Sequence, residues 1–309
     1  MTAAYYQAIP ERQRSVVDGW QDVIARMLRW MAAMCHQDGE IGFFNDAAIG
    51  IAPSPNDLDV YALRLEFLRF SAQIEGVTHL ENSGYLRIQH GPMTALIDAA
   101  PVGPDYLPAH GHADTLSFEL SLFGQRVLVN SGTSHYGIDA ERLRERGTAA
   151  HNTVVVDGLD SSEVWGSFRV ARRALPALLS ITQQEHQIIV DASHGGYRHL
   201  PGRNIHRRRW VVADDSMIIE DEITGSFNSA EARFHLHPYI KIDEYHSRDG
   251  RVVLFLQDGQ RVEFATDSGY LRLERSFWHP GFGENVPNLC LAVNFSSSKL
   301  KTNISWREN

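Results

Sequence analysis

The stretch that most clearly decides the fold is Pro108–Asn130, PAHGHADTLSFELSLFGQRVLVN. From residue 117 to 122, serine and glutamate alternate with phenylalanine and leucine. On an extended chain such alternation places the apolar side chains on one face and the polar ones on the other. The stretch therefore predicts a β-hairpin, and Gly124-Gln125 is the expected turn.

Similar short runs fill the chain after about Ser71. They include YLRIQHG, MTALIDAA, NTVVVDG, HQIIVDAS, RRRWVVAD, SMIIEDEI and YLRLERSF, and turn residues such as DG, DD and DSG separate them. Many short strands with no helical stretch between them are typical of an antiparallel sandwich. We therefore expect a mainly β protein built on a large antiparallel β-sandwich.

The first seventy residues show a different pattern. Apolar residues recur at intervals of three and four from Arg12 to Met34, which predicts an amphipathic helix. A second helix is expected to begin at Ser54, because serine caps helices and Pro55 fits the first helical position. The sequence thus predicts two parts, a small helical segment over residues 1–72 and a β-sandwich over residues 73–309.

Composition excludes several classes of protein. With 309 residues, 43% of them hydrophobic, the chain can bury a large core, and its net charge of −9 argues against a general nucleic-acid binder. Cys35 and Cys290 are too few and too far apart to predict a disulfide framework or a zinc–thiolate site. The N-terminus does not resemble a signal peptide, and no apolar run is long enough to predict membrane insertion.

Three side chains that bind metals or transfer protons stand two residues apart: His110, His112 and Asp114. On an extended backbone they point to the same side. Further polar residues end or precede neighbouring strands, so all of them are expected to meet at one end of the sandwich: Asn130, His135, Tyr136, Arg146, His151 and Asn152. A zinc site and a hydrogen-bonded cluster both fit this pattern, and a zinc-dependent hydrolase is a third, less supported hypothesis because no H-E-x-x-H motif is present.

Two longer segments carry a resemblance to a known family. HGHADTLSFELSLFGQRVLVNSGTSHYG and ERLRERGTAAHNTVVVDGLDSSEVWGSFRVARRA resemble the C-terminal β-sandwich of the heparinase II/III-like polysaccharide lyases. GFFNDAAIGIAP and the helices around it resemble the last turns of that family's α/α-toroid domain. The resemblance covers nearly the whole chain and implies that residues 1–72 are the end of a toroid.

The resemblance implies a structural zinc site. His112 and His151 match two zinc ligands of the family, whose third ligand is usually an aspartate at the end of a strand. Asn130 stands at that position here, and its amide oxygen is an uncharged, weaker ligand. We expect zinc held by His112, Asn130 and His151, with a hydrogen-bonded remnant of the site as the alternative.

The resemblance also implies β-elimination in uronic-acid polysaccharides. His110 matches a histidine of the catalytic cleft and is expected to act in acid–base chemistry or charge neutralisation, with Tyr136 as substrate contact or proton-transfer partner. The remaining expected contacts line the two sides of the cleft: Asn45 and Asp46 on the toroid side, Arg142 and Arg146 for carboxylates or sulfates, and Glu163 and Trp165 on the sandwich side. Trp165 is expected to stack on a sugar or to lie in the core.

Two functions remain open from the sequence. One is a polysaccharide lyase, or its C-terminal part, that acts on a glycosaminoglycan, alginate or bacterial exopolysaccharide. In the family the toroid supplies the principal base and acid from positions far upstream of H-x-H, and most of that region is absent here. The alternative is therefore a non-catalytic carbohydrate-binding or assembly module in exopolysaccharide metabolism.

The resemblance also implies a periplasmic or extracellular location. A helix rich in tryptophan and methionine predicts a surface that contacts a partner, which includes a second copy of this chain, that is, a homo-oligomer.

Overall fold

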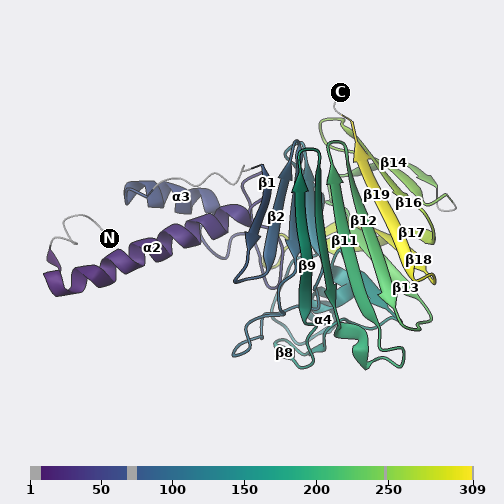
Figure 1. Cartoon of the computed structure of the whole chain (residues 1–309), viewed down its shortest axis with the longest axis horizontal. Helices are drawn as coiled ribbons and strands as arrows, with labels where there is room; N and C mark the ends of the chain where they lie inside the picture. The colour runs from purple at the N-terminus through teal and green to yellow at the C-terminus, as the bar shows by residue number, and fades with distance from the viewer. Residues whose placement is uncertain (1–7, 68–74, 247–248, 308–309) are drawn as a thin grey trace.

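The computed structural model describes residues 8–67, 75–246 and 249–307. Within these ranges the protein is mainly β, with antiparallel sheets stacked into a sandwich and a helical arm at the N-terminus (Figure 1). The predicted fold class is thus confirmed. The predicted boundary between residues 72 and 73 falls in the segment 68–74, which lies outside the described residues.

The described strands form three large sheets and one small one. The first sheet contains β1 (Gly76–Leu80), β2 (Tyr85–His90), β3 (Met93–Asp98), β4 (Phe118–Leu122) and β5 (Gln125–Leu128), in that order. The second contains β14 (Lys241–His246), β15 (Arg251–Phe255), β16 (Arg261–Thr266), β19 (Lys299–Trp306), β12 (Ser216–Thr224), β11 (Ile205–Ala213), β10 (Gln187–His194) and β9 (Pro176–Gln184). The third contains β17 (Tyr270–Trp278), β18 (Val286–Phe295), β13 (Ala230–His235) and β6 (Val154–Val156), and β7 (Val164–Trp165) pairs with β8 (Arg169–Val170).

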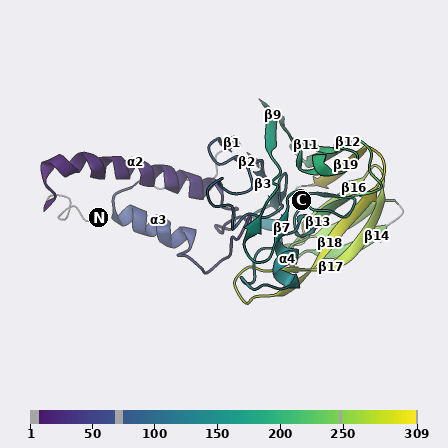
Figure 2. The same cartoon turned by 90° about the horizontal axis from the view of Figure 1, so that it is seen from below.

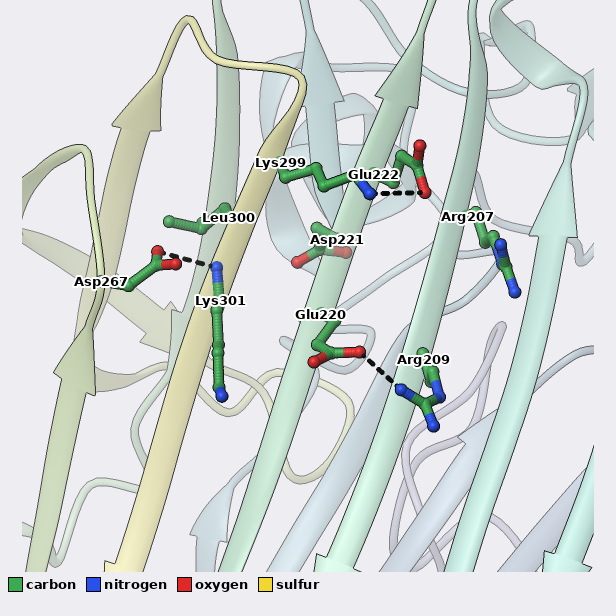
Figure 3. Close-up of a pocket in the computed structure, with 9 residues that line it drawn as sticks. All are labelled: Arg207, Arg209, Glu220, Asp221, Glu222, Asp267, Lys299, Leu300 and Lys301. Carbon is green, nitrogen blue, oxygen red and sulfur yellow. Dashed lines mark hydrogen bonds and ion pairs between the residues drawn. The ribbon is translucent and has the colours of Figure 1, made fainter.

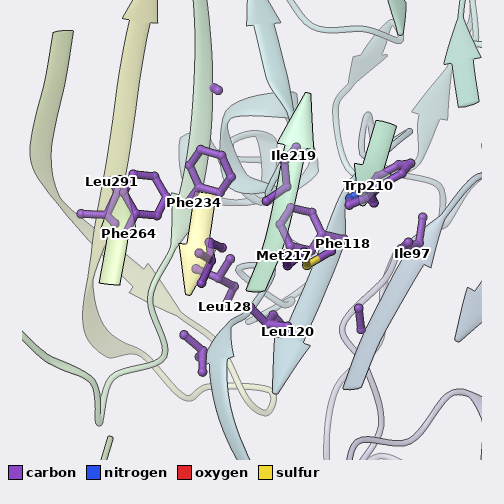
Figure 4. Packing of buried hydrophobic residues seen from close by; sticks show 14 of the residues in the cluster. Ile97, Phe118, Leu120, Leu128, Trp210, Met217, Ile219, Phe234, Phe264 and Leu291 are labelled. Atoms are coloured by element: carbon purple, nitrogen blue, oxygen red, sulfur yellow. The ribbon is translucent and has the colours of Figure 1, made fainter. Parts of the chain in front are cut away.

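The core lies between the long second sheet and the other two large sheets. Phe118 of β4 packs against Trp210 of β11, and Phe234 of β13 packs against Phe264 of β16 (Figure 4). Phe118 and Phe234 also contact each other, and a bridge between Leu128 and Leu236 links the first sheet to the third. One continuous apolar core therefore fixes the three sheets relative to one another.

The hairpin predicted in the opening stretch is present as β4 and β5, but its turn lies one residue earlier. Leu122 pairs with Gln125, so Phe123 and Gly124 form the two-residue loop. Both have positive φ, 53° and 76°. A tight turn of this kind needs positive φ at both central residues, and glycine provides it without strain.

Both faces of β4 are buried, which alternation alone does not predict. The apolar face joins the main core, whereas the face that carries Glu119 and Ser121 is covered by the segment that follows the first helix. The polar residues of this strand therefore hold the N-terminal part of the chain against the sandwich.

Two helices form the N-terminal arm, α2 (Glu11–Ala33) and α3 (Pro55–Arg64), which lie side by side and extend away from the sheets (Figures 1 and 2). Both agree with the expected helices, and the side chain of Ser54 caps α3 by accepting from the backbone N–H of Asp57. Apolar residues of α2 such as Trp20 and Met27 are exposed. Among the described residues, no helix is long and apolar enough to cross a membrane.

A buried histidine pair links strands β10, β11 and β12. His194 Nε2 lies 3.2 Å from His206 Nδ1, and His206 Nε2 lies 2.7 Å from an Asp221 oxygen. Arg208 also binds Asp221 through two hydrogen bonds. Burial lowers the pKa of both histidines below its ordinary value, although Asp221 opposes this for His206, so folding favours the neutral form of both.

This pair predicts that stability falls in mild acid. In the unfolded chain both histidines have pKa values near ~6.5, so below that pH the unfolded state binds more protons than the folded state. Each histidine then lowers the free energy of unfolding by up to about 1.4 kcal/mol per pH unit, until the pH reaches its folded-state pKa. Urea denaturation from about pH 7.5 to about pH 5.5 measures the decline. His206→Gln is expected to show a shallower decline than wild type, and an equal slope would contradict the assignment.

Candidate functional site

The site is built where the segment after α2 crosses the first sheet. Glu119 of β4 anchors this segment: one carboxylate oxygen lies 2.9 Å from His36 Nε2 and accepts from the backbone N–H of Phe43 at 3.1 Å. Its other oxygen accepts from the backbone N–H of Asn130 at 2.7 Å. One buried side chain thus fixes the N-terminal segment and the end of the β5 strand together, close to Asp46.

Asp46 is the centre of the site. Its carboxylate accepts from His110 Nδ1 and from His112 Nε2, each at 2.8 Å, and from Arg142 through two hydrogen bonds of 2.5 and 2.8 Å. Burial alone would raise the pKa of this carboxyl, but hydrogen bonds and charge from His112 and Arg142 outweigh burial and hold its pKa well below the usual range. Asp46 is therefore a charged hub that orients three side chains.

The preceding residue, Asn45, directs Asp46 inward. Its φ is 54°, a left-handed conformation that asparagine tolerates better than most residues. Its side-chain amide donates to the Tyr85 hydroxyl at 2.8 Å and accepts from the backbone N–H of His112 at 3.3 Å. Asn45 was predicted to contact substrate. In the structure its amide joins the N-terminal segment to the H-x-H loop, and the predicted contact stays a prediction.

His110 binds Asp46 through Nδ1, and its other ring nitrogen, Nε2, makes no hydrogen bond among the described residues. Because the ionised Asp46 can only accept, His110 donates from Nδ1, and its Nε2 carries a lone pair when the ring is neutral. The side chain is 55% exposed, whereas the Asp46 side chain is 5% exposed. A carboxylate-oriented imidazole at a solvent boundary is an arrangement suited to taking a proton from a bound molecule.

Two exposed aromatic rings, Tyr136 and Phe168, lie beside His110, and a third, Phe282, lies next to Tyr136; we call these three rings the aromatic cluster. The His110 ring lies 5.8 Å from Tyr136 and 5.5 Å from Phe168, centroid to centroid. Tyr136 lies 5.1 Å from Phe168 and 4.9 Å from Phe282. Partial burial and the Asp46 charge raise the pKa of Tyr136, although Arg142 opposes them, so its phenol keeps its proton at neutral pH.

Arg142 and Arg146 come from the short helix α4 (Ala140–Arg146), and both are fully buried. Arg142 is held by Asp46 and by the Ser167 carbonyl, and its guanidinium lies 5.1 Å from the Tyr136 ring centroid. Arg146 donates to backbone carbonyls, with Gly111 at 3.0 Å, and burial lowers its pKa to about 10. Neither reaches the surface, so their predicted attraction for substrate anions would have to act through their electric field.

Two of the expected metal ligands, His112 and His151, lie together in the interior, and the third, Asn130, is buried as well. The ring centroids of His112 and His151 are 5.3 Å apart, and in the part of the chain that the structure describes, His112 Nδ1 and both nitrogens of His151 are buried without a hydrogen-bond partner. Burial and the charges of His112 and His235 hold the pKa of His151 well below its usual range. The Asn130 amide oxygen accepts from the backbone N–H of Asn152 at 3.1 Å and keeps a second lone pair.

This donor set fits a metal ion. His112 donates from Nε2 to Asp46, which leaves Nδ1 as a free ligand, and metal-binding histidines commonly use a carboxylate in this way. Unpaired imidazole nitrogens in the interior are costly unless something binds them. A bound metal would give a partner to His112 Nδ1 and to one of the two His151 nitrogens.

Asp114, the third residue of the predicted His110–His112–Asp114 group, has different contacts from the two histidines. Its carboxylate accepts from the backbone N–H of Asn45 at 3.3 Å and interacts with Asp98. Burial raises the pKa of Asp98 and Asp114. Asp114 makes no hydrogen bond to His110, His112 or Asp46 among the described residues, and residues 110–117 contain turns and a bend instead of the extended strand that the prediction assumed.

The remaining predicted residues lie at the edge of the site. Trp165 is 46% exposed on β7, so it is not a core residue, and Glu163 is an exposed neighbour that pairs loosely with Arg172 at 3.8 Å. No ring contact joins Trp165 to the aromatic cluster among the described residues. Their predicted contacts with a sugar stay predictions.

Several important residues were missed by sequence reasoning. Phe168 and Phe282 lie in loops without a motif, and Glu119 looks like a solvent-facing residue of an alternating strand. His279 Nε2, 2.9 Å from Glu141 and 3.4 Å from Glu145, completes a second polar cluster behind the site. Glu141, Glu145 and His279 could together hold a metal ion. Arg144, however, already contacts Glu141 and His279 and supplies positive charge there.

A pocket of about 400 Å³ on the outer face of the second sheet lies apart from this site (Figure 3). Its charges neutralise one another across strands: Arg209 binds Glu220 at 3.0 Å, and Lys299 lies 3.7 Å from Glu222. Exposed cross-strand pairs of this kind stabilise a sheet slightly. Neither a histidine nor an aromatic ring lines the pocket, so we do not assign it a reaction.

Comparisons with known proteins agree with this geometry. The model of the heparinase II/III-like C-terminal domain matches residues 73–307. Three similar structures are a heparinase III, the BT4657 gene product (TM-score 0.74, 16% identity, 94% of this chain and 47% of that one), the heparan sulfate lyase HepC from Pedobacter heparinus (0.75, 13%, 94% and 48%), and another heparinase III (0.71, 15%, 91% and 47%).

At these identities the structural similarity shows a shared fold, and the chain spans about half the length of the proteins that it matches. No curated protein sequence matches it significantly. The family match covers most of the chain, including the H-x-H loop, α4 and the loops that carry the aromatic cluster. The chain therefore belongs to the heparinase II/III-like family and carries the C-terminal domain of that family.

Proposed function

We propose that this chain is a polysaccharide lyase, or the C-terminal part of one, that cleaves uronic-acid-containing polysaccharides by β-elimination. The observation that carries the proposal is the Asp46–His110 pair: a buried carboxylate fixes Nδ1 of a half-exposed imidazole and leaves Nε2 free to accept a proton. Tyr136 stands beside it with a protonated phenol.

The proposed reaction begins at the carbon next to the uronate carboxylate. His110 Nε2 takes the proton from that carbon, and the electron pair of the broken C–H bond moves onto the carboxylate oxygens as an enolate. The pair then returns to form a carbon–carbon double bond while the bond to the glycosidic oxygen breaks. Tyr136 gives its proton to the departing oxygen. The products are an unsaturated uronate and a shortened chain with a free hydroxyl.

The buried cations assist through charge. Arg146 forms no ion pair among the described residues; backbone carbonyls accept from its guanidinium, and the Asp46 carboxylate compensates its charge only from a distance. A positive field behind His110 favours the negative charge that develops on the substrate carboxylate. Arg142, in contrast, is balanced by Asp46 and positions that carboxylate.

We also propose that His112, Asn130 and His151 hold a structural zinc ion. The free imidazole nitrogens and the spare lone pair of Asn130 support this assignment. Zinc would tie the H-x-H loop to the ends of two strands and would thereby fix the orientation of His112 against Asp46. The reaction steps above do not pass through the metal.

Analysis of chain ends tests the proposed function. The protein is incubated with heparan sulfate, alginate and a uronate-containing bacterial exopolysaccharide, and new ends are identified by ultraviolet absorbance and mass spectrometry. Unsaturated uronate ends support the lyase. Saturated ends would show that the protein is a hydrolase and not a lyase. Binding without new ends would favour the alternative function, a carbohydrate-binding or assembly module. This alternative is consistent with a chain that covers 47% of the matched heparinase III.

A further inference from the structure

The aromatic cluster is unusual because apolar rings are left exposed together. Tyr136, Phe168 and Phe282 come from three separate loops and are 39%, 39% and 41% exposed. The two phenylalanines have no polar atom that would explain their exposure. Contiguous exposed apolar side chains on a protein surface commonly mark a binding site.

The cluster extends away from His110 in one direction. Tyr136 and Phe168 both contact the His110 ring, whereas Phe282 contacts Tyr136 and, among the described ring contacts, does not touch His110. Phe282 therefore stands one ring farther along the surface than the residues that flank the proton-transfer group.

Backbone contacts hold the loop that carries Phe168 in place. The Ser167 hydroxyl donates to the carbonyls of Tyr136 and Gly137, and the Ser167 carbonyl accepts from Arg142. This loop is thereby tied to the backbone of Tyr136. The rings of Phe168 and Tyr136 are thus set in position before any ligand binds.

The Phe282 loop is held in the same way. The Gly283 N–H donates to the Ser134 carbonyl at 2.8 Å, and His279 bridges to Gly132. Gly132 has a φ of 74°, and a Cβ there would lie 2.1 Å from the His279 carbonyl oxygen, so only glycine allows this close approach.

We propose that the aromatic cluster is a sugar-binding subsite in which Phe168 stacks on the pyranose ring at the reacting bond and Phe282 stacks on the next sugar of the polymer. The inference rests on the proposed function and extends it. A pyranose presents a flat face of C–H groups, and that face packs against an aromatic ring. Phenylalanine offers stacking alone, so this subsite reads the shape and length of the polymer rather than its charge.

Binding of heparan sulfate fragments of defined length tests the subsite. Isothermal titration is performed with disaccharide, tetrasaccharide and hexasaccharide fragments on the whole chain, on three phenylalanine variants and on one control variant. Phe168→Ala is expected to weaken every fragment about tenfold. Phe282→Ala and Phe282→Leu are expected to remove the gain in affinity from disaccharide to tetrasaccharide, since leucine is apolar but lacks a flat face. Tyr270→Ala, which removes a 55% exposed ring at the opposite end of β17, is the matched control and should bind like wild type.

The outcomes separate this inference from the proposed function. Normal length dependence in Phe282→Ala, or no binding of any fragment by wild type, would overturn the subsite. Length-dependent binding that needs Phe282 but yields no unsaturated ends would support the subsite and reject the lyase. Unsaturated ends released equally well by wild type and all three phenylalanine variants would support the lyase and reject the subsite.

Discussion

Asp46→Asn is expected to lower the free energy of unfolding by about 3–5 kcal/mol, because it leaves the buried Arg142 guanidinium without its counter-charge. The variant also places an amide N–H₂ against groups that donate to Asp46, including His110 and His112. Urea denaturation at neutral pH measures the loss.

Asp139→Asn is the matched control for this variant. Asp139 also binds a histidine, with one oxygen 2.7 Å from His135 Nε2, but its side chain is about half exposed. Water can therefore replace its contacts, and a much smaller loss is expected. Equal losses for the two variants would show that Asp46 is an ordinary surface carboxylate and not the hub of the site.

His151→Leu is expected to remove zinc from the protein and to lower its stability. If free zinc stands about 1,000-fold above the dissociation constant, the bound ion contributes about 4 kcal/mol to folding. Elemental analysis and thermal denaturation of wild type and variant measure both effects, and a chelator should destabilise wild type but not the variant.

The same variant also distinguishes a zinc-bound site from a metal-free one. Among the described residues the His151 side chain has no hydrogen-bond partner, so without a metal its replacement by an apolar side chain of similar size would be nearly neutral or stabilising. His194→Leu is the control: it removes another fully buried histidine, but one with protein partners, and should leave the zinc content unchanged. Zinc-free wild type together with a stable His151→Leu would disprove the proposed metal site.

The sequence predicted the parts of the fold that depend on local pattern. Alternation predicted the β-sandwich, and the serine–proline pair at Ser54 and Pro55 predicted the start of α3 correctly. The hairpin turn was misplaced by one residue, because Phe123 adopts a positive φ, which the presence of a phenylalanine in a sequence does not predict. Asp114 does not share the hydrogen bonds of His110 and His112, because the H-x-H segment contains turns and is not an extended strand.

The site could be predicted only in part, because its centre depends on contacts between distant residues. His110, His112 and Tyr136 stood out through their motifs, but the Asp46–Arg142 pair joins positions 96 residues apart. Phe168 and Phe282 reach the site from loops on different sheets, and no local pattern links them. Glu119 was hidden because a buried glutamate in an alternating strand has the same sequence signature as an exposed one.

The most direct test of the account is the initial rate at which wild type and His110→Ala release unsaturated uronate from one polymer. The Asp46–His110 pair is predicted to supply general-base catalysis, so the variant should be slower by about 10²–10⁴-fold. His135→Ala is the control, since His135 also pairs with an aspartate and is 38% exposed in a nearby loop, and it should keep its activity. A wild-type rate in His110→Ala, or a loss as large in His135→Ala, would contradict the assignment of His110 as the proton-transfer group.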